Sequence, residues 1–278
     1  MRRATLTCVA AILIVGAAAV GAGADGGPSP GVLWGWNGIA SYRGQVRYVA
    51  VTTGRSTLVE VVRVLGGRVL RWRSLPGTYG VPLVAYDGSA GGLSRDGKIL
   101  VLASSAARPG SGGTSRFAVL ETRTLRSRAV ITLPGSFSFD AVSPGGSTLY
   151  LIQYTSSQDY NRYRVRAYDV TKRELLPDAL VDKREPDEQM GGTPVSRVST
   201  ADGRWAYTLY VRADGAPFVH ALDTVDREAY CIDLPAQVDP QRQYRLRLRF
   251  GREHELNVRN GRKILAVVDM EKLEARRR

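Results

Sequence analysis

The chain has 278 residues, of which 44% are hydrophobic and 23% are charged. This length suits one large domain or two modest ones, and the composition is that of a globular protein rather than a disordered one. Two cysteines cannot form a disulfide framework, and two histidines leave little scope for histidine-rich metal or acid–base sites.

The first 24 residues have the layout of a secretory signal peptide. Arg2 and Arg3 precede an uncharged run over residues 4–24, which ends in the small-residue triplet A-G-A. A charged start, an apolar centre and a small-residue cleavage site are the parts of such a signal. We therefore expect cleavage after residue 24, a short linker over 25–33, and export to the cell envelope or the medium. The alternatives are a retained membrane anchor and the twin-arginine export route.

The net charge is +13, and the loss of Arg2 and Arg3 with the signal would leave +11. A positive field of this size attracts anionic polymers and membrane surfaces. The chain has no nucleic-acid recognition motif, so we expect no specific nucleic-acid partner. An anionic polymer of the cell envelope is one candidate partner, and the membrane is another only if the signal segment is retained.

Beyond residue 30, short β-branched and aromatic runs alternate with turn residues, and the pattern repeats. The turn glycines Gly44, Gly97, Gly146, Gly203 and Gly251 are 48 to 57 residues apart. Glycine suits such turns because it adopts positive φ freely. Each turn leads into a strong strand, which predicts one hairpin at the same place in every repeat.

A third strand in several repeats ends in an acidic residue. The acids are Glu121, Asp169, Asp223 and Asp269. A carboxylate at the start of a turn accepts hydrogen bonds from nearby backbone N–H groups. We therefore expect these acids to cap turns rather than to bind a ligand.

Four antiparallel strands in each unit of about 50 residues are typical of a β-propeller blade. The sequence predicts an all-β fold: one propeller domain over 34–278, closed into a ring, with a signal helix before it. Its five four-stranded blades would cover approximately 34–87, 88–137, 138–193, 194–239 and 240–278.

The residues that carry a family resemblance lie in these repeats. Residues 141–151, A-V-S-P-G-G-S-T-L-Y-L, resemble the S-P-D-G-x-x-x-Y-V step of bacterial YVTN-type and WD-type propeller repeats. Residues 220–224 and 265–270 look like their V-x-V-I-D-T step. The resemblance implies a propeller and, for exported members, a binding or surface protein, with enzymes in the minority. Position 145 departs from the repeat because it is Gly rather than Asp.

The candidate site follows from loop length. In a blade, the second connection and the loop to the next blade lie on one face, and these are the longer loops here. Function concentrates on loops that a rigid scaffold holds. Asp140 should lie near the central channel. The candidate ligand contacts are Tyr79, Asp87, Arg108, Asp140, Asp159, Tyr160, Arg162 and Arg197.

Other chemistry-bearing residues have structural explanations. His220 and Cys231 lie in strand-like runs, where we expect a structural histidine and a buried thiol. The four tryptophans also lie in such runs and are expected in the core. No zinc spacing, calcium loop, phosphate loop or nucleophile elbow is present, so no metal or cofactor is expected.

The sequence favours a monomeric, exported, non-enzymatic propeller that binds a protein or an anionic envelope or glycan ligand through its loop-rich face. The alternative is a propeller hydrolase or lyase that acts on a carbohydrate or lactone. That alternative requires two or three of Asp87, Asp140, Asp159 and Arg197 to converge in one pocket, with at least one perturbed pKa among them. A weaker third reading is a surface anchor that uses net charge alone.

Overall fold

The structure is a computed structural model, which describes residues 30–108, 110–159, 162–187 and 190–278. The predicted signal peptide and the candidate contact Tyr160 lie outside these residues. None of the helical structure in the described ranges is long and apolar enough to span a membrane.

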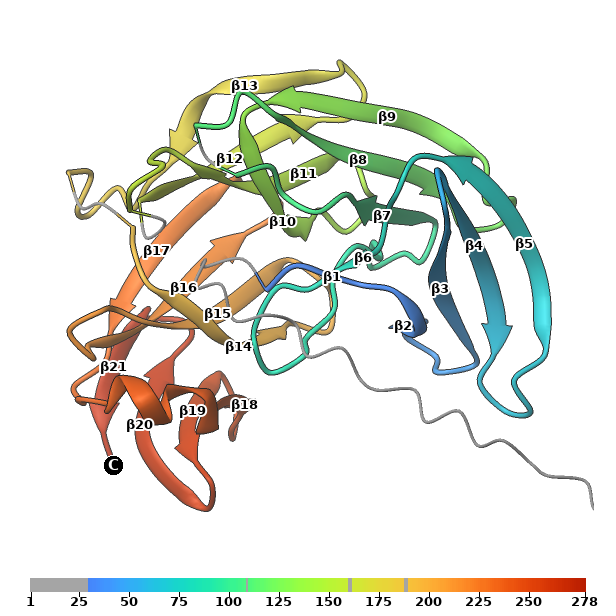
Figure 1. Ribbon diagram of the computed structural model, residues 1–278. Coiled ribbons are helices and arrows are strands. Elements are labelled where there is room, and N and C mark those ends of the chain that lie inside the picture. The colour runs from blue at the N-terminus through green and yellow to red at the C-terminus, as the bar shows by residue number, and fades with distance from the viewer. Residues whose placement is uncertain (1–29, 109, 160–161, 188–189) are drawn as a thin grey trace, which may run out of the picture.

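The described chain is almost entirely β-structure, and its strands form six sheets (Figure 1). Sheet I contains β2 (Gly35–Ala40), β3 (Val46–Thr53), β4 (Ser56–Arg63) and β5 (Val69–Pro76). Sheet II contains β7 (Ile99–Ala103), β8 (Thr114–Glu121) and β9 (Ser127–Pro134). Sheet III contains β10 (Ser136–Val142), β11 (Thr148–Tyr154), β12 (Tyr163–Asp169) and β13 (Glu174–Leu180).

Sheet IV contains β14 (Thr193–Ser199), β15 (Trp205–Val211), β16 (Pro217–Asp223) and β17 (Glu228–Asp233). Sheet V contains β18 (Leu246–Phe250), β19 (Glu255–Asn260), β20 (Lys263–Asp269) and β21 (Glu274–Arg277). A two-stranded ribbon joins β1 (Val32–Leu33) to β6 (Val81–Pro82), and a 3-10 helix, η1 (Pro240–Arg245), precedes sheet V.

The predicted all-β fold and its four-stranded antiparallel sheets are confirmed for sheets I, III, IV and V. The second unit differs, because sheet II has three strands. Isolated bridges from Leu93 to Leu100 and from Gly80 to Ala103 stand where its innermost strand was expected. Glycines interrupt this segment at positions 91 and 92, and glycine has a low tendency to form strands.

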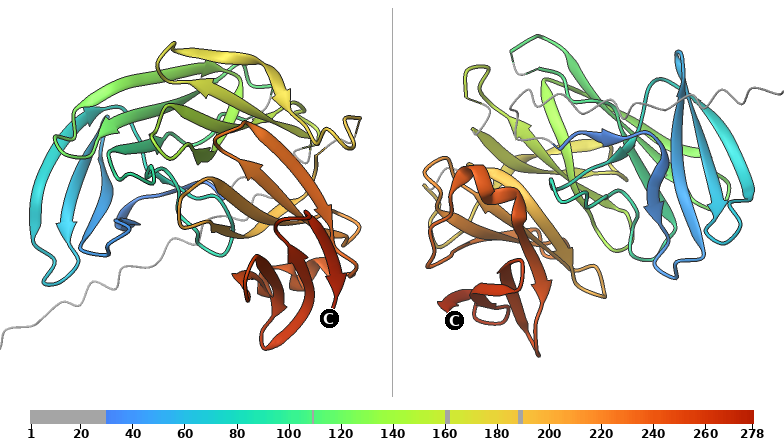
Figure 2. Two further views of the ribbon diagram at one scale, coloured as in Figure 1. Left: turned by 180° about the vertical axis from the view of Figure 1, so that it is seen from behind. Right: turned by 60° about the horizontal axis from the view of Figure 1, so that its bottom comes forward.

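The sheets follow one another around an arc, which is open between sheets I and V (Figures 1 and 2). The expected closed ring is therefore not observed. Strands are paired in chain order within each sheet, so no sheet joins the two ends of the chain. The loop over 83–92 extends into the middle of the arc, where the ring of Tyr86 packs against the ring of Tyr244 in η1. The backbone N–H of Tyr86 donates to the Pro194 carbonyl.

Consecutive sheets bury their facing sides against each other. Tyr48 and Val59 of sheet I pack with Leu100 and Leu102 of sheet II, and equivalent apolar clusters join the later sheets. Each fully buried side chain of this size contributes about 1.5–3 kcal/mol. The expectation for tryptophan was wrong at three positions, because Trp34, Trp36 and Trp72 are 47%, 65% and 65% exposed.

Local turn chemistry agrees with the repeat. Gly44, Gly97, Gly146 and Gly203 all have positive φ, whereas in the fifth turn His254 rather than Gly251 takes this conformation. Three of the four acids at the ends of the third strands cap turns as expected, whereas the side chain of Glu121 accepts a hydrogen bond from the Thr124 hydroxyl instead. Asp169, Asp223 and Asp269 each accept hydrogen bonds from two backbone N–H groups in the turn that follows.

Gly146 and its neighbour Gly145 provide a matched test of the repeat geometry. Gly146 has a φ of +76°, and a Cβ there would lie 2.5 Å from Ile99 Cγ1, whereas a Cβ at Gly145 would meet open space. Gly146→Ala should lower the free energy of unfolding by about 2 kcal/mol, because the alanine would have to adopt a left-handed backbone conformation and its Cβ would clash with Ile99 in the core. Gly145→Ala should change it by less than about 1 kcal/mol. Urea unfolding of both variants checks this, and equal effects would contradict the turn geometry.

Candidate ligand-binding site on the loop-rich face

One face of the arc carries the longer loops. Because the strands of a sheet alternate in direction, the second connection of a sheet and the loop to the next sheet emerge on the same face. The second connection of sheet III, over 155–162, and the inter-sheet loops over 181–192 and 234–245 are long. Sheet II lacks its innermost strand, so its long β7–β8 loop over 104–113 takes the place of a second connection. Loops 104–113 and 155–162 approach each other, since a Cβ at Gly110 would lie 2.8 Å from the Ser157 Cβ. We call this side the loop-rich face.

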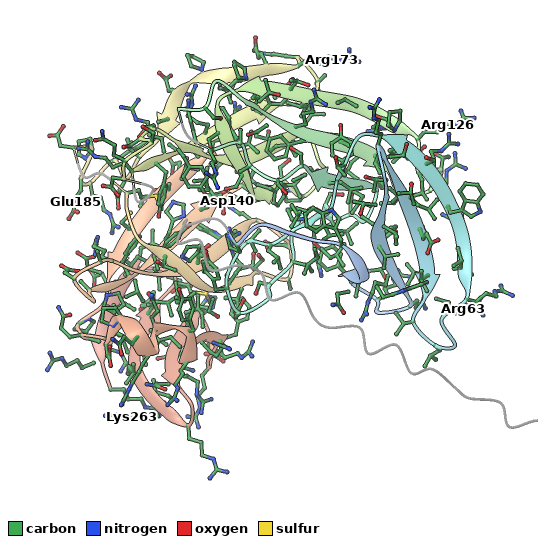
Figure 3. The ribbon with its side chains drawn as sticks, in the orientation of Figure 1. Arg63, Arg126, Asp140, Arg173, Glu185 and Lys263 are labelled. Atoms are coloured by element: carbon green, nitrogen blue, oxygen red, sulfur yellow. The ribbon has the colours of Figure 1, made fainter. Side chains whose placement is uncertain are left out.

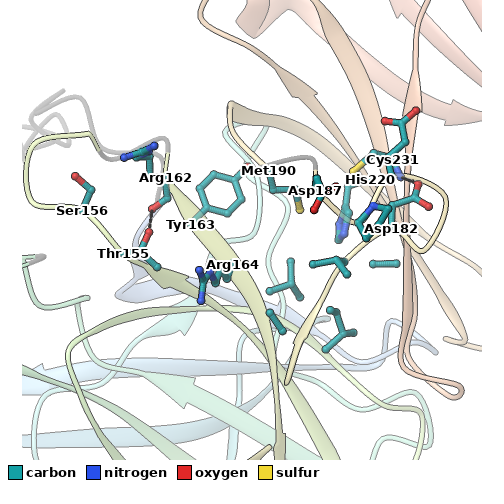
Figure 4. A pocket seen from close by; sticks show the side chains of 17 residues that line it. Thr155, Ser156, Arg162, Tyr163, Arg164, Asp182, Asp187, Met190, His220 and Cys231 are labelled. Atoms are coloured by element: carbon teal, nitrogen blue, oxygen red, sulfur yellow. Dashed lines mark hydrogen bonds between the residues drawn. The ribbon is translucent and has the colours of Figure 1, made fainter. Parts of the chain in front are cut away.

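A cavity of about 540 Å³ opens between sheets III and IV at this face (Figure 4). Its size is within the range of small-ligand pockets. Loop 155–162 and β12 form one wall, and loop 181–192 with β16 and β17 forms the other. Side chains that line it include Thr155, Arg162, Tyr163, Arg164, Asp182, Asp187, Met190, His220 and Cys231.

A row of polar side chains crosses sheet IV beneath this cavity. Arg197, Thr208, His220 and Cys231 are direct partners on four successive strands, so their side chains share the face that packs on sheet III. The rows on either side are largely apolar, with Tyr210 and Phe218 in one and Ala206, Leu222 and Ala229 in the other. The polar row therefore runs between two apolar layers.

Several atoms of this row are buried without a hydrogen-bond partner among the described residues. They are Arg197 Nε, Thr208 Oγ1 and His220 Nε2, together with Oδ2 of Asp140 opposite Arg197. Buried polar groups in proteins are normally satisfied by protein, water or ligand. The row thus has hydrogen-bonding capacity that the described protein groups do not use, and His220 presents part of it at the cavity.

His220 is 1% exposed and electrically neutral at physiological pH. Burial is the main cause, and it lowers the pKa of His220 to about 4. The Asp140 carboxylate opposes this effect and the Arg197 guanidinium adds to it. A neutral imidazole has one donor and one acceptor nitrogen, so His220 can serve a neutral polar group of a ligand.

Asp182 fixes the wall formed by loop 181–192. Its carboxylate accepts hydrogen bonds from the Arg184 guanidinium and from the backbone N–H groups of Arg184 and Cys231. Burial alone would raise the pKa of Asp182, but these hydrogen bonds outweigh it and lower the pKa. Asp182 therefore ties the loop to β17 and is not available to a ligand as a free carboxylate. Cys231 is half-buried beside it.

The predicted contacts separate into two groups and one core residue. Arg162 lines the cavity, and Arg108 and Asp159 are exposed on the second connections of the same face. Tyr79 is 3% exposed in the core between sheets I and II, so we leave it out of the proposed site.

The second group lies in the middle of the arc, where Figure 3 shows Asp140 inside the molecule. Asp140 and Arg197 form a salt bridge whose side chains are 3% and 7% exposed, at the edge of a second cavity of about 310 Å³. The carboxylate of Asp87 accepts hydrogen bonds from Ser196 Oγ at 2.7 Å and from the Ser89 N–H at 3.0 Å. All three charged groups are thus engaged by other parts of the chain.

The sequence-based reasoning missed the polar row, although one signal was available. Thr208 and His220 stand in the runs W-A-Y-T-L-Y-V and P-F-V-H-A-L-D, whose other central residues are apolar. A polar residue in the middle of a fully buried strand must find a partner across the sheet interface. Met190 and Asp187 had no such signal, because only the path of loop 181–192 brings them to the cavity.

Comparisons with known proteins give likenesses of shape only. No protein-family model matches the chain, and no curated protein matches it. A functionally unknown protein from Desulfotomaculum acetoxidans is similar over 83% of this chain and 64% of its own, at 12% identity and a TM-score of 0.47. The Swd1 β-propeller domain from Myceliophthora thermophila is similar over 84% of this chain and 62% of its own, at 14% identity and a TM-score of 0.46. TolB from Acinetobacter baumannii is similar over 76% of this chain and 45% of its own, at 12% identity and a TM-score of 0.42.

Proposed function

We propose that this chain is an exported, non-catalytic binding protein that holds a short polypeptide segment of a protein partner in the cavity between sheets III and IV. The observation that carries the proposal is the cavity itself, built by two long loops of the loop-rich face over a buried histidine whose Nε2 has no partner in the described chain. Export rests on the layout of the first 24 residues. We further propose that sheet II and the β1–β6 ribbon act together as one blade, which gives five units.

The charges at the cavity favour a ligand with groups of both signs. Arg162 and Arg164 are exposed on one wall, and Glu185 and Asp187 are exposed on the other. None of these four side chains forms an ion pair within the described ranges. A peptide has acidic and basic side chains that can pair with these charges. Its apolar side chains can pack against Met190, and its backbone amides can hydrogen-bond to His220. A purely anionic polymer would meet the two carboxylates.

The arrangement in the middle of the arc favours binding over hydrolysis. A glycosidase or lyase needs carboxylates free to exchange protons with a substrate. The carboxylate of Asp140 instead forms a salt bridge with the buried guanidinium of Arg197. The carboxylate of Asp87 accepts hydrogen bonds from the Ser196 hydroxyl and the Ser89 N–H. These contacts support structural roles for both acids.

An array of short immobilised peptides, probed with the secreted protein, tests the proposed function. We expect a subset with both acidic and basic residues to bind. Arg164→Glu and Asp187→Lys should each weaken that binding at least about ten-fold, which corresponds to 1.4 kcal/mol. Arg126→Glu and Glu253→Lys change the same charges on exposed turns of the opposite face and should leave it unchanged.

Heparin and a teichoic acid serve as anionic probes in the same experiment. Retention on these polymers that is equal in all variants and disappears in a few tenths molar salt would indicate net charge alone, and would overturn the peptide proposal. Binding to no peptide on the array would also overturn it.

A further inference from the structure

Two sheet faces in this fold have no neighbouring sheet, because the arc is open. One is the side of sheet I that points away from sheet II, and the other is the side of sheet V that points away from sheet IV (Figure 2). We call them the free face of sheet I and the free face of sheet V. Elsewhere in the chain, the facing sides of consecutive sheets are packed against each other.

The free face of sheet I is apolar and aromatic, with one acid, Glu60, and one base, Arg47, which lies on the same side of β3 and donates to the Trp36 carbonyl at 3.4 Å. Val49, Glu60 and Trp72 are direct partners across β3, β4 and β5, but Val49 is only 1% exposed. The apolar surface of this face is therefore that of Trp72 and of the partly exposed Val51 and Leu58 in the next row. Trp72 is 65% exposed, and exposed apolar surface of this kind marks interaction sites. Glu60 forms no ion pair within the described chain, and its Oε2 is buried without a hydrogen-bond partner there. This carboxylate lacks the cation that would offset its partial burial.

The free face of sheet V is rich in arginine. Arg247 pairs with Arg259, and Arg249 pairs with Asn257, so three guanidinium groups share this side of β18 and β19. None of the three forms an ion pair within the described chain. Arg259 Nε and Asn257 Oδ1 are buried without hydrogen-bond partners among the described residues. The face therefore combines positive charge with unused hydrogen-bonding groups.

We propose that the free face of sheet I of one copy packs against the free face of sheet V of a second copy. The two faces are complementary in charge, since one has an unpaired carboxylate and the other has unpaired guanidinium groups. They are also complementary in chemistry, because arginine stacks favourably on tryptophan. Within one chain the two faces lie at opposite ends of the arc (Figures 1 and 2). This association differs from the monomer expected from the sequence.

The contact is head to tail, so each added copy leaves one free face of each kind. Contacts of this type produce rings or longer chains rather than only dimers. A four-stranded sheet face measures about 15 by 20 Å from ordinary strand spacing, which is smaller than a standard stable interface and is the size of a weak, transient one. We therefore expect reversible association at micromolar concentration.

Light scattering and sedimentation of the secreted protein test the proposal. The weight-average mass should rise above that of one chain as concentration increases from about 1 to about 200 µM, the range of a weak interface. Glu60→Arg and Arg259→Glu should each reduce association at least ten-fold. An equimolar mixture of the two variants should recover association, because it restores one native contact, and the double variant should recover it through the reversed pair.

Trp72→Ser provides a second route, since an exposed side chain can be replaced without unfolding the chain. It should also reduce association, and Glu253→Lys, outside both faces, should not. A mass that stays at one chain throughout would overturn the proposal. So would failure of both charge-swapped combinations to recover association in folded protein. The peptide cavity lies elsewhere, so loss of association leaves peptide binding intact.

Discussion

Arg197→Met should lower the free energy of unfolding by about 3–5 kcal/mol, because it leaves the buried carboxylate of Asp140 without its cation. The side chains of the pair are 7% and 3% exposed, and Arg197 also donates to the Asp140 carbonyl at 3.2 Å. A carboxylate that is 3% exposed is poorly solvated by bulk water. The loss should therefore be much larger than the loss of one surface contact.

Chemical unfolding of two further variants separates this cause from a general loss of packing. Arg242→Met removes an ion pair with Asp239 at 3.6 Å, whose side chains are 70% and 52% exposed, and should cost less than about 1 kcal/mol. The double replacement Arg197→Met with Asp140→Leu should recover much of the loss, because neither charge remains buried. If Arg197→Met costs no more than Arg242→Met, the buried pair does not stabilise the fold.

The stability of the folded chain should fall as the pH decreases from about 6.5 to about 4, and His220 should account for about 3 kcal/mol of the loss. Burial lowers the pKa of His220 to about 4 in the folded state, whereas a histidine in the unfolded chain titrates near 6.5. Between these values the unfolded chain binds a proton that the folded chain does not. The contribution is complete above pH 6.5 and is lost as the pH falls toward 4.

Unfolding free energies at several pH values between 5 and 7.5 check this, because most carboxylates remain ionised in that range. His220→Leu should flatten the dependence. His254 is exposed on a turn, and His254→Gln is the matched control that should leave the dependence as in the unmodified chain. An equally steep decline in His220→Leu would assign the effect to other groups.

The local features of this fold were predictable from the sequence. The turn glycines and the capping acids act within a few residues of their own position, so Gly146 and Asp223 could be assigned without knowing what packs against them. The strand repeat was predictable for the same reason. Ring closure was not, because it depends on how all the sheets are arranged in space, and the spacing of residues along the sequence does not give that arrangement.

The candidate site was predictable only in part. Long loops indicated the face on which Arg162 lies, and Arg162 lines the cavity there. The row that includes Thr208 and His220 depends on which residues of neighbouring strands are paired, and sequence spacing does not fix that register. Trp72 looked like a core residue because it lies in a strand, but its strand is the outermost one of a sheet with no neighbour on that side.

Each four-stranded sheet is a continuous stretch of chain whose strands pair in sequential order. Duplication or deletion of the last sheet at the carboxyl end would therefore lengthen or shorten the arc by one sheet and leave the junctions between the earlier sheets intact. A closed ring in which one sheet contains strands from both chain termini cannot gain or lose a sheet in this way. This architecture thus permits the number of modules to vary among descendants of one ancestral gene.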